Sequence, residues 1–102
     1  MVSVATRSTD HCDELAANAT DQEKHPDAPG IAWNELAAVA QDAIDACKSA
    51  VARQPKTARF KYQLARAMQV QDPLSAEREM ADLVQEGYAA AFDNYALSLI
   101  HI

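Results

Sequence analysis

Apolar residues recur at three- and four-residue steps over four stretches of the chain, which predicts four amphipathic helices. The predicted helices cover about 39–54, 58–70, 73–86 and 90–100, and the breaks between them are Gln54-Pro55, Asp72-Pro73 and Gly87-Tyr88. Each helix is roughly 12–15 residues long, which is too short for stability in water on its own. Each must therefore bury its apolar side against its neighbours in the chain.

The same periodicity predicts which side chains are buried. In the second helix the apolar stripe is Phe60, Leu64, Ala67 and Met68, whereas Arg59, Lys61, Gln63 and Arg66 are expected to face outward. The third helix is expected to bury Leu74, Met80, Leu83 and Val84. Tyr62 falls beside the stripe of its helix, so it is either an aromatic for peptide binding or a contact with the preceding helix.

The residues at the ends of the third helix are typical of helix termini. Asp72 is expected to cap its start, with Pro73 at the first helical position, where a missing N–H costs nothing. Gly87 suits the left-handed position after its end, and Tyr88 can pack back on the helix.

Residues 1–38 carry little apolar periodicity. Residues 1–9 are expected to be a disordered lead-in, and Asp10 is a plausible cap for a short helix over about 10–18. A loop with Pro26, Pro29 and Gly30 follows, and Trp33 is expected to pack this part onto the first main helix. We therefore predict one domain over 10–102, made of a leader (10–38) and the repeat helices (39–102).

Composition and charge narrow the class of protein. Hydrophobic residues make up 49% of the chain, but aromatics only 6%, and two glycines and four prolines are too few turns for a many-stranded fold. The expected class is all-α, built of antiparallel helical hairpins.

Residues 1–50 hold nine acidic against three basic residues, a net charge of −6, which argues against nucleic acid and anionic lipid as partners.

One run of basic residues opposes this acidic balance. It comprises Arg53, Lys56, Arg59, Lys61 and Arg66, without an acidic residue between them. It is interpreted either as a solvated surface around a turn or as a docking patch for an acidic partner.

The chain shows no export or membrane signal. No apolar run approaches the ~18–20 residues of a membrane span, and the N-terminus lacks the features of a signal peptide. The protein is then either cytoplasmic or a mature form whose export signal is absent.

Cys12 and Cys47 are the two cysteines, and three interpretations compete. A disulfide would hold the ends of the long loop, and closing a loop of ~36 residues is worth roughly 4 kcal/mol. Two buried free thiols would fit Cys47 as a core residue. A zinc site with His11 and His25 would lack the usual ligand spacings. The disulfide is favoured, and it implies a periplasmic or secreted protein, whereas free cysteines imply the cytoplasm.

Part of the chain resembles a known family. Residues 42–56, DAIDACKSAVARQPK, resemble the second helix of a tetratricopeptide repeat, with Ala43, Cys47, Ala50 and Pro55 at its small, apolar, small and proline positions. Residues 60–67 resemble the first helix of the next repeat, with Ala65 at its glycine-or-alanine position.

The tail is closer to the Sel1-like variant of this family. Residues 86–97 match it at Ala91 and Asn94, while Tyr95 and Ala96 replace the usual Leu-Gly. The pieces around Cys12 and Cys47 resemble the leader of some bacterial exported proteins of this kind. The resemblance covers about 42–100.

The resemblance implies a protein-interaction scaffold that binds a protein or peptide and carries neither catalytic chemistry nor a cofactor. The groove of such a scaffold would be lined by Lys61, Tyr62, Gln63, Arg66 and Gln69. The alternative is a structural N-terminal cap of a longer repeat array, with no partner of its own. No metal site is expected, because the usual ligand spacings are absent. No enzyme activity is expected, because no nucleophile is arranged beside His11, His25 or His101.

The last predicted helix is more apolar than one neighbour can cover. Its exposed surface is expected to comprise Phe92, Tyr95, Leu99 and Ile100. Since a terminal repeat normally has a polar outer side, we expect either that the chain continues in the natural protein or that this helix mediates self-association.

Overall fold

The computed structural model describes the backbone of residues 9–101 and the side chains of residues 9–95. Within that range lie the helices α2 (His11–Ala16), α3 (Trp33–Ala38), α4 (Ala40–Arg53), α5 (Ala58–Gln71), α6 (Pro73–Gln85) and α7 (Ala89–His101). No strand occurs among the described residues, so the predicted all-α class is confirmed. Residues 1–8 of the predicted disordered lead-in lie outside the described range.

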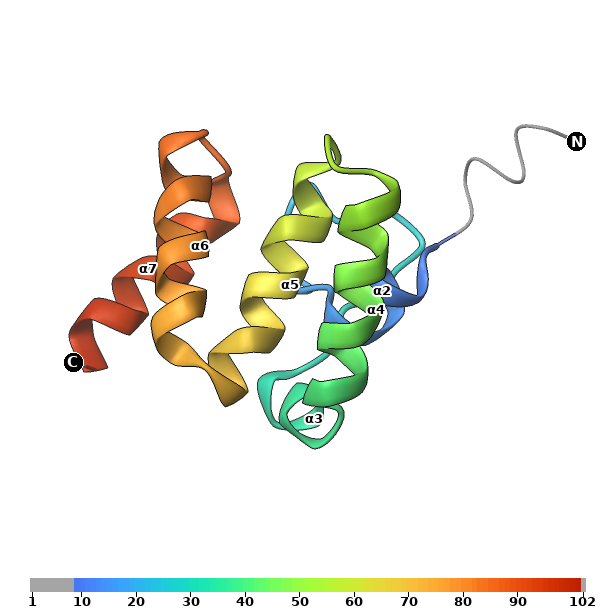
Figure 1. Ribbon diagram of the computed structural model, residues 1–102, viewed down its shortest axis with the longest axis horizontal. Helices are drawn as coiled ribbons and strands as arrows, with labels where there is room; N and C mark the ends of the chain where they lie inside the picture. Colours follow the sequence, from blue (N-terminus) through green and yellow to red (C-terminus); the bar gives the residue numbers. More distant parts are fainter. Residues whose placement is uncertain (1–8, 102) are drawn as a thin grey trace, which may run out of the picture.

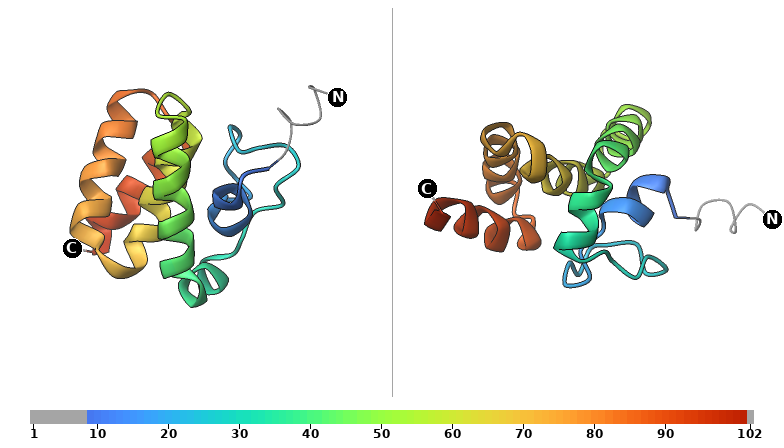
Figure 2. Two further views of the ribbon diagram at one scale, coloured as in Figure 1. Left: turned by 45° about the vertical axis from the view of Figure 1, so that its right-hand side comes forward. Right: turned by 90° about the horizontal axis from the view of Figure 1, so that it is seen from below.

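The helices form two layers around α5. In one layer α4, α5 and α6 lie side by side in chain order, with α5 in the centre (Figure 1). Seen from below, α7 and the leader lie on the same side of that layer (Figure 2). The central helix is in contact with each of the other described helices. The position of α5 therefore determines which of its side chains can reach solvent.

The helix ends follow the predicted capping residues. Asp10 accepts a hydrogen bond from the Cys12 N–H at 2.9 Å, and Asp72 accepts one from the Ser75 N–H at 3.3 Å. Gly87 has a φ of +86°, and the Tyr88 N–H donates to the Leu83 carbonyl at 2.9 Å. These local predictions are confirmed.

Two apolar clusters lie on opposite sides of α5. The first joins α2, α3, α4 and α5 and contains Cys12, Ala16, Leu36, Ala43, Ile44, Cys47, Ala50, Phe60 and Ala67. The second joins α5, α6 and α7 and contains Tyr62, Ala65, Met80, Leu83, Tyr88 and Ala91. Two predictions of burial are wrong. Trp33 is 48% exposed, because Leu36 makes the core contact of α3, and Leu74 is 71% exposed on the first turn of α6.

The long loop between α2 and α3 is closed at its neck. The Ile31 N–H donates to the Ala17 carbonyl at 2.8 Å, which brings the two ends of the loop together. Gly30 has a φ of +90°, and a Cβ at this position would lie 2.5 Å from the Ala19 nitrogen. Any other residue at position 30 would clash with the backbone of Ala19 at the other end of the loop.

A disulfide joins the leader to the first main helix. Cys12 and Cys47 are bonded with an S–S distance of 2.04 Å, and their Cα atoms lie 4.6 Å apart. The bond connects α2 to α4 over a sequence separation of 35 residues, which confirms the predicted pairing. Because the two sulfurs are bonded to each other, the interpretations as free thiols and as zinc ligands are excluded.

In the described part of the chain, none of the helices has the length and apolar character needed to cross a bilayer.

Removing this disulfide is expected to destabilise the protein substantially. The Cys12→Ser/Cys47→Ser double variant should lose about 4 kcal/mol of unfolding free energy, because the unfolded chain regains the freedom of a loop of ~36 residues. Urea unfolding followed by circular dichroism measures the difference. A loss below about 1 kcal/mol would show that the leader adds little to global stability.

Candidate functional site

Five polar side chains form a row along one side of α5. The row consists of Arg59, Tyr62, Gln63, Arg66 and Gln69, which recur at three- and four-residue steps and therefore lie on one side of the helix. We call it the polar row of α5. Four of the five predicted partner-binding residues belong to it, whereas Lys61 lies on another side of α5 and is half-buried.

The leader contacts four of the five side chains in the polar row of α5, all except Gln69. Tyr62 and Gln63 are fully buried, and Arg66 is 5% exposed. The expectation that Gln63 and Arg66 face outward is therefore wrong. The sequence pattern marked them as exposed because polar side chains usually face water, but here their partners come from residues 10–31.

Asp13 of α2 is held by donors from α5. Arg59 donates through Nε to Oδ1 at 2.9 Å and through Nη2 to Oδ2 at 3.2 Å, which makes a bidentate ion pair with a buried carboxylate. Gln63 Nε2 donates to the same Oδ1 at 3.1 Å, and the Asp10 N–H donates to Oδ2 at 2.9 Å. Both carboxylate oxygens are thus fully engaged.

The pKa of Asp13 lies below its ordinary value of 3.8. Burial by itself raises the pKa, because it disfavours the charged carboxylate. The hydrogen bonds from Arg59, the Asp10 amide and Gln63, together with the charge of Arg59, outweigh burial and favour the ionised form.

Arg66 binds backbone carbonyls of the leader. Its Nη1 donates to the carbonyls of Ala16 and Ala17 at 3.2 and 3.1 Å, and its Nη2 donates to the Ile31 carbonyl at 2.7 Å. These carbonyls belong to the C-terminal end of α2 and the neck of the loop, where a cation also complements the helix dipole. Burial lowers the pKa of Arg66 below its ordinary value.

Two tyrosines extend the buried polar contacts to α7. The Tyr62 hydroxyl accepts from Asn18 Nδ2 at 3.0 Å and donates to Asn94 Oδ1 at 2.7 Å. The Tyr88 hydroxyl donates to Asp21 Oδ2 at 2.6 Å, and the two rings stack at 5.1 Å. Burial raises the pKa of both hydroxyls, so they stay neutral donors.

Gln69, at the end of the polar row, contacts α7. Its Oε1 accepts a hydrogen bond from Asn94 Nδ2 at 3.0 Å. The same Asn94 side chain also binds Tyr62, so one asparagine of α7 connects two positions of the row.

Three of the five residues in the basic run bind the leader, two of them through acidic side chains. Arg53 Nη2 donates to Asp10 Oδ2 at 2.8 Å, Arg59 pairs with Asp13, and Arg66 binds the carbonyl end of α2. Both interpretations of the run placed it at the surface or against another molecule. Arg53 and Lys56 are exposed, as a solvated surface around the turn would be, whereas Arg59 and Arg66 pack against the leader.

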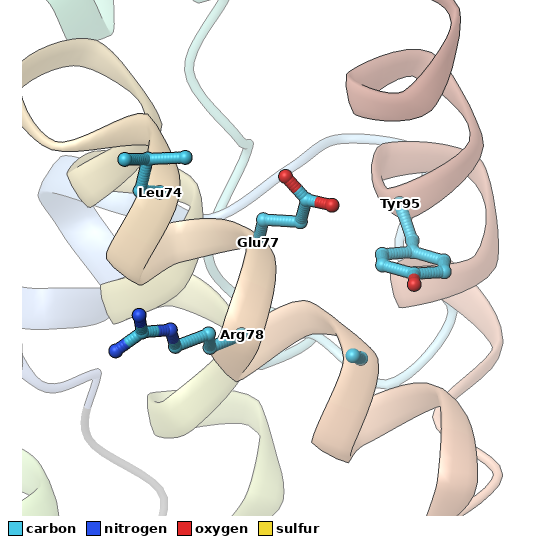
Figure 3. Close-up of a pocket in the computed structure, with 5 residues that line it drawn as sticks. Leu74, Glu77, Arg78 and Tyr95 are labelled. Atoms are coloured by element: carbon cyan, nitrogen blue, oxygen red, sulfur yellow. The ribbon is translucent and has the colours of Figure 1, made fainter. Parts of the chain in front are cut away.

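A second candidate surface lies on α6 and α7. A pocket of about 310 Å³ is lined by Leu74, Glu77, Arg78 and Ala81 of α6 and by Tyr95 of α7 (Figure 3). Phe92 is 53% exposed and lies three residues before Tyr95 on α7. Sequence reasoning selected Phe92 and Tyr95 but missed the residues on α6. The side chains of Leu99 and Ile100, which were also predicted for this surface, lie outside the described residues.

The described residues offer no evident metal site. No group of three or more histidine, cysteine, aspartate or glutamate side chains among them could hold a metal ion. Comparison with known proteins identifies no relative, since no family model, curated protein or solved structure matches the chain. The function is therefore inferred from the residues and their geometry.

Replacing Arg66 is expected to loosen the leader. Arg66→Met keeps most of the packing volume but leaves three carbonyls without their donor, so unfolding free energy should fall by about 3 kcal/mol. The matched control is Arg78→Met on the exposed side of α6, which should change stability by less than about 0.5 kcal/mol. Urea unfolding of both variants measures the contrast, and equal losses would contradict a special role for Arg66.

The depressed pKa of Asp13 predicts a stability change in acid. Because its folded pKa lies below 3.8, its contribution is fully present above the unfolded pKa and is lost as pH falls through the folded value. The stability difference between wild type and Asp13→Asn should therefore shrink as pH falls from about 6 to about 2. Urea unfolding along this series tests it, with Asp82→Asn on the exposed side of α6 as the control. A difference that stays constant with pH would contradict the prediction.

Proposed function

We propose that the chain is a protein-interaction scaffold of the tetratricopeptide or Sel1-like type, which binds a protein or peptide partner. The observation that carries the proposal is the pocket between α6 and α7 with two large apolar side chains exposed around it. The succession α4 to α7, in which each helix packs on the next, supports an arrangement of helical hairpins.

The chemistry of this surface suits a protein partner. Leu74, Arg78 and Ala81 lie on one side of α6, and Phe92 and Tyr95 lie on one side of α7. Protein docking sites combine an apolar centre with a polar rim, and Glu77 and Arg78 supply charged groups beside the apolar ones. Exposed apolar side chains that gather around a hollow are typical of such sites.

We further propose that the protein acts in the periplasm or outside the cell. The support is the Cys12–Cys47 disulfide, since disulfides persist in oxidising compartments. The cytoplasmic alternative depended on free cysteines. No catalytic activity and no cofactor are proposed.

A structural N-terminal cap of a longer repeat array is the second candidate. It is favoured by an asymmetry of the described residues: the leader covers α4 and α5, whereas Leu74 and Phe92 remain exposed on α6 and α7. In a cap those two side chains would pack against a following helical hairpin instead of a separate partner.

Charged substitutions in the pocket surface are expected to abolish partner capture. Immobilised wild type should retain specific proteins from an extract of its source cells, and Leu74→Asp/Phe92→Asp should lose them, because aspartate cannot enter an apolar contact unpaired. The matched control is Ala52→Asp on the exposed side of α4, which should retain them. Mass spectrometry of the retained proteins measures the difference.

Three other results would contradict the proposed partner surface. Equal capture by wild type and the double variant would place the docking site elsewhere. Concentration-dependent dimerisation of wild type that the double variant loses, with no foreign protein captured, would show that this surface binds a second copy. Capture of nothing by a monomeric wild type would favour the structural cap.

A further inference from the structure

Residues 10–31 are held on the helical layer mainly by polar contacts and one disulfide. We call them the covering segment. Its only regular element is α2, which has six residues, far fewer than a helix needs for stability in water. The covering segment adds two fully buried apolar side chains to the first cluster, Cys12 and Ala16. Leu15 and Ile31 are half-buried beside them.

Ala17 and Ala28 are also buried, and the other contacts of the covering segment are hydrogen bonds and ion pairs. They join Asp10 to Arg53, Asp13 to Arg59 and Gln63, three carbonyls to Arg66, Asn18 to Tyr62, and Asp21 to Tyr88. Water can replace each of these partners when the segment leaves, so the cost of release is far smaller than for a helix with a wide apolar side.

The rest of the molecule keeps its own apolar contacts without the covering segment. The second cluster contains only residues of α5, of α6 and of the segment from Tyr88 onward. Within the first cluster, Ala43, Ile44 and Ala50 of α4 still meet Phe60 and Ala67 of α5. The covering segment therefore qualifies as a separate unit of local unfolding, and Cys12–Cys47 is the covalent bond that holds it down.

We propose that the polar row of α5 is a latent binding site for an acidic peptide, covered by residues 10–31 and opened by reduction of the Cys12–Cys47 disulfide. The contacts now made by the covering segment define the ligand. Arg59 and Gln63 take a carboxylate, Arg66 takes backbone carbonyls, and Tyr62 takes a side-chain amide. The ligand is therefore a short peptide that carries an aspartate at the start of a helical turn.

The opening step is a thiol–disulfide exchange with a dithiol reductant. A thiolate of the reductant attacks one sulfur of the disulfide, forms a mixed disulfide and releases the other cysteine as a thiol. The second thiol of the reductant then breaks the mixed disulfide, so that Cys12 and Cys47 gain two electrons and two protons and the reductant leaves oxidised. Both cysteines are fully buried, so local opening of the covering segment must precede the attack.

This site is separate from the proposed partner surface on α6 and α7. The polar row of α5 carries two guanidinium groups and one buried amide, whereas the α6–α7 surface is apolar with two charges beside it. Either site can exist without the other, and the experiment below involves no residue of the α6–α7 surface.

The test uses the full chain and a labelled synthetic peptide that copies residues 9–31 with serine in place of Cys12. Fluorescence anisotropy should show binding to the chain reduced with dithiothreitol at least about tenfold tighter than to the oxidised chain. A matched peptide with Asp10→Asn and Asp13→Asn should bind the reduced chain at least about tenfold more weakly, because it lacks the carboxylates for Arg53 and Arg59. The Arg59→Gln chain should show the same loss.

Hydrogen exchange on the same samples separates release of the segment from binding. On reduction, the amides of Ala17 and Ile31 should lose protection while the amides within α5 and α6 keep theirs. Three results would overturn the proposal: a covering segment that stays protected after reduction, a released segment with no peptide binding, or loss of protection throughout the chain. Reduced chains that form dimers by exchanging residues 10–31 would support it, because the segment then binds in trans.

Discussion

The buried carboxylate of Asp13 is the constraint on which the arrangement of this molecule depends. A charged group without water must be surrounded by donors, and those donors come from Arg59, Gln63 and the backbone of Asp10. The requirement fixes how α2 lies on α5, and it places Cys12, the residue before Asp13, against Cys47 of α4. The ion pair and the disulfide thus support the same position of the leader.

The position of the leader determines which surfaces of the protein are free to bind a partner. Because the leader covers the polar row of α5, the side chains best suited to bind a polypeptide already bind one within the same chain. The apolar side chains of α6 and α7 have no such cover among the described residues, and Leu74 and Phe92 remain exposed. The proposed partner surface and the covered polar row therefore lie on different helices of the same chain.

One polar atom on the covered side of α5 lowers the stability of the folded protein. Gln63 Oε1 is buried and accepts no hydrogen bond within the described part of the chain, while its Nε2 serves both Asp13 and the sulfur of Cys12. An unpaired buried acceptor costs about 1–3 kcal/mol, which reduces the net gain from covering α5. A leader held by strong but imperfectly balanced polar contacts is consistent with a segment that can separate from the helical layer.

The sequence alone determined the local structure, because helix formation depends on periodicity and on capping residues that are adjacent in the chain. The main helices, the caps at Asp10 and Asp72, and the turn at Gly87 were all predictable in this way. The loop that needed a tether also indicated the Cys12–Cys47 pair. Only the tertiary structure decided what the polar row of α5 contacts, since a stripe of arginine, glutamine and tyrosine looks the same whether it faces water or a folded-back leader. Burial of Gln63 and Arg66, and exposure of Trp33 and Leu74, follow from contacts between residues far apart in the chain, and helical periodicity carries no information about those.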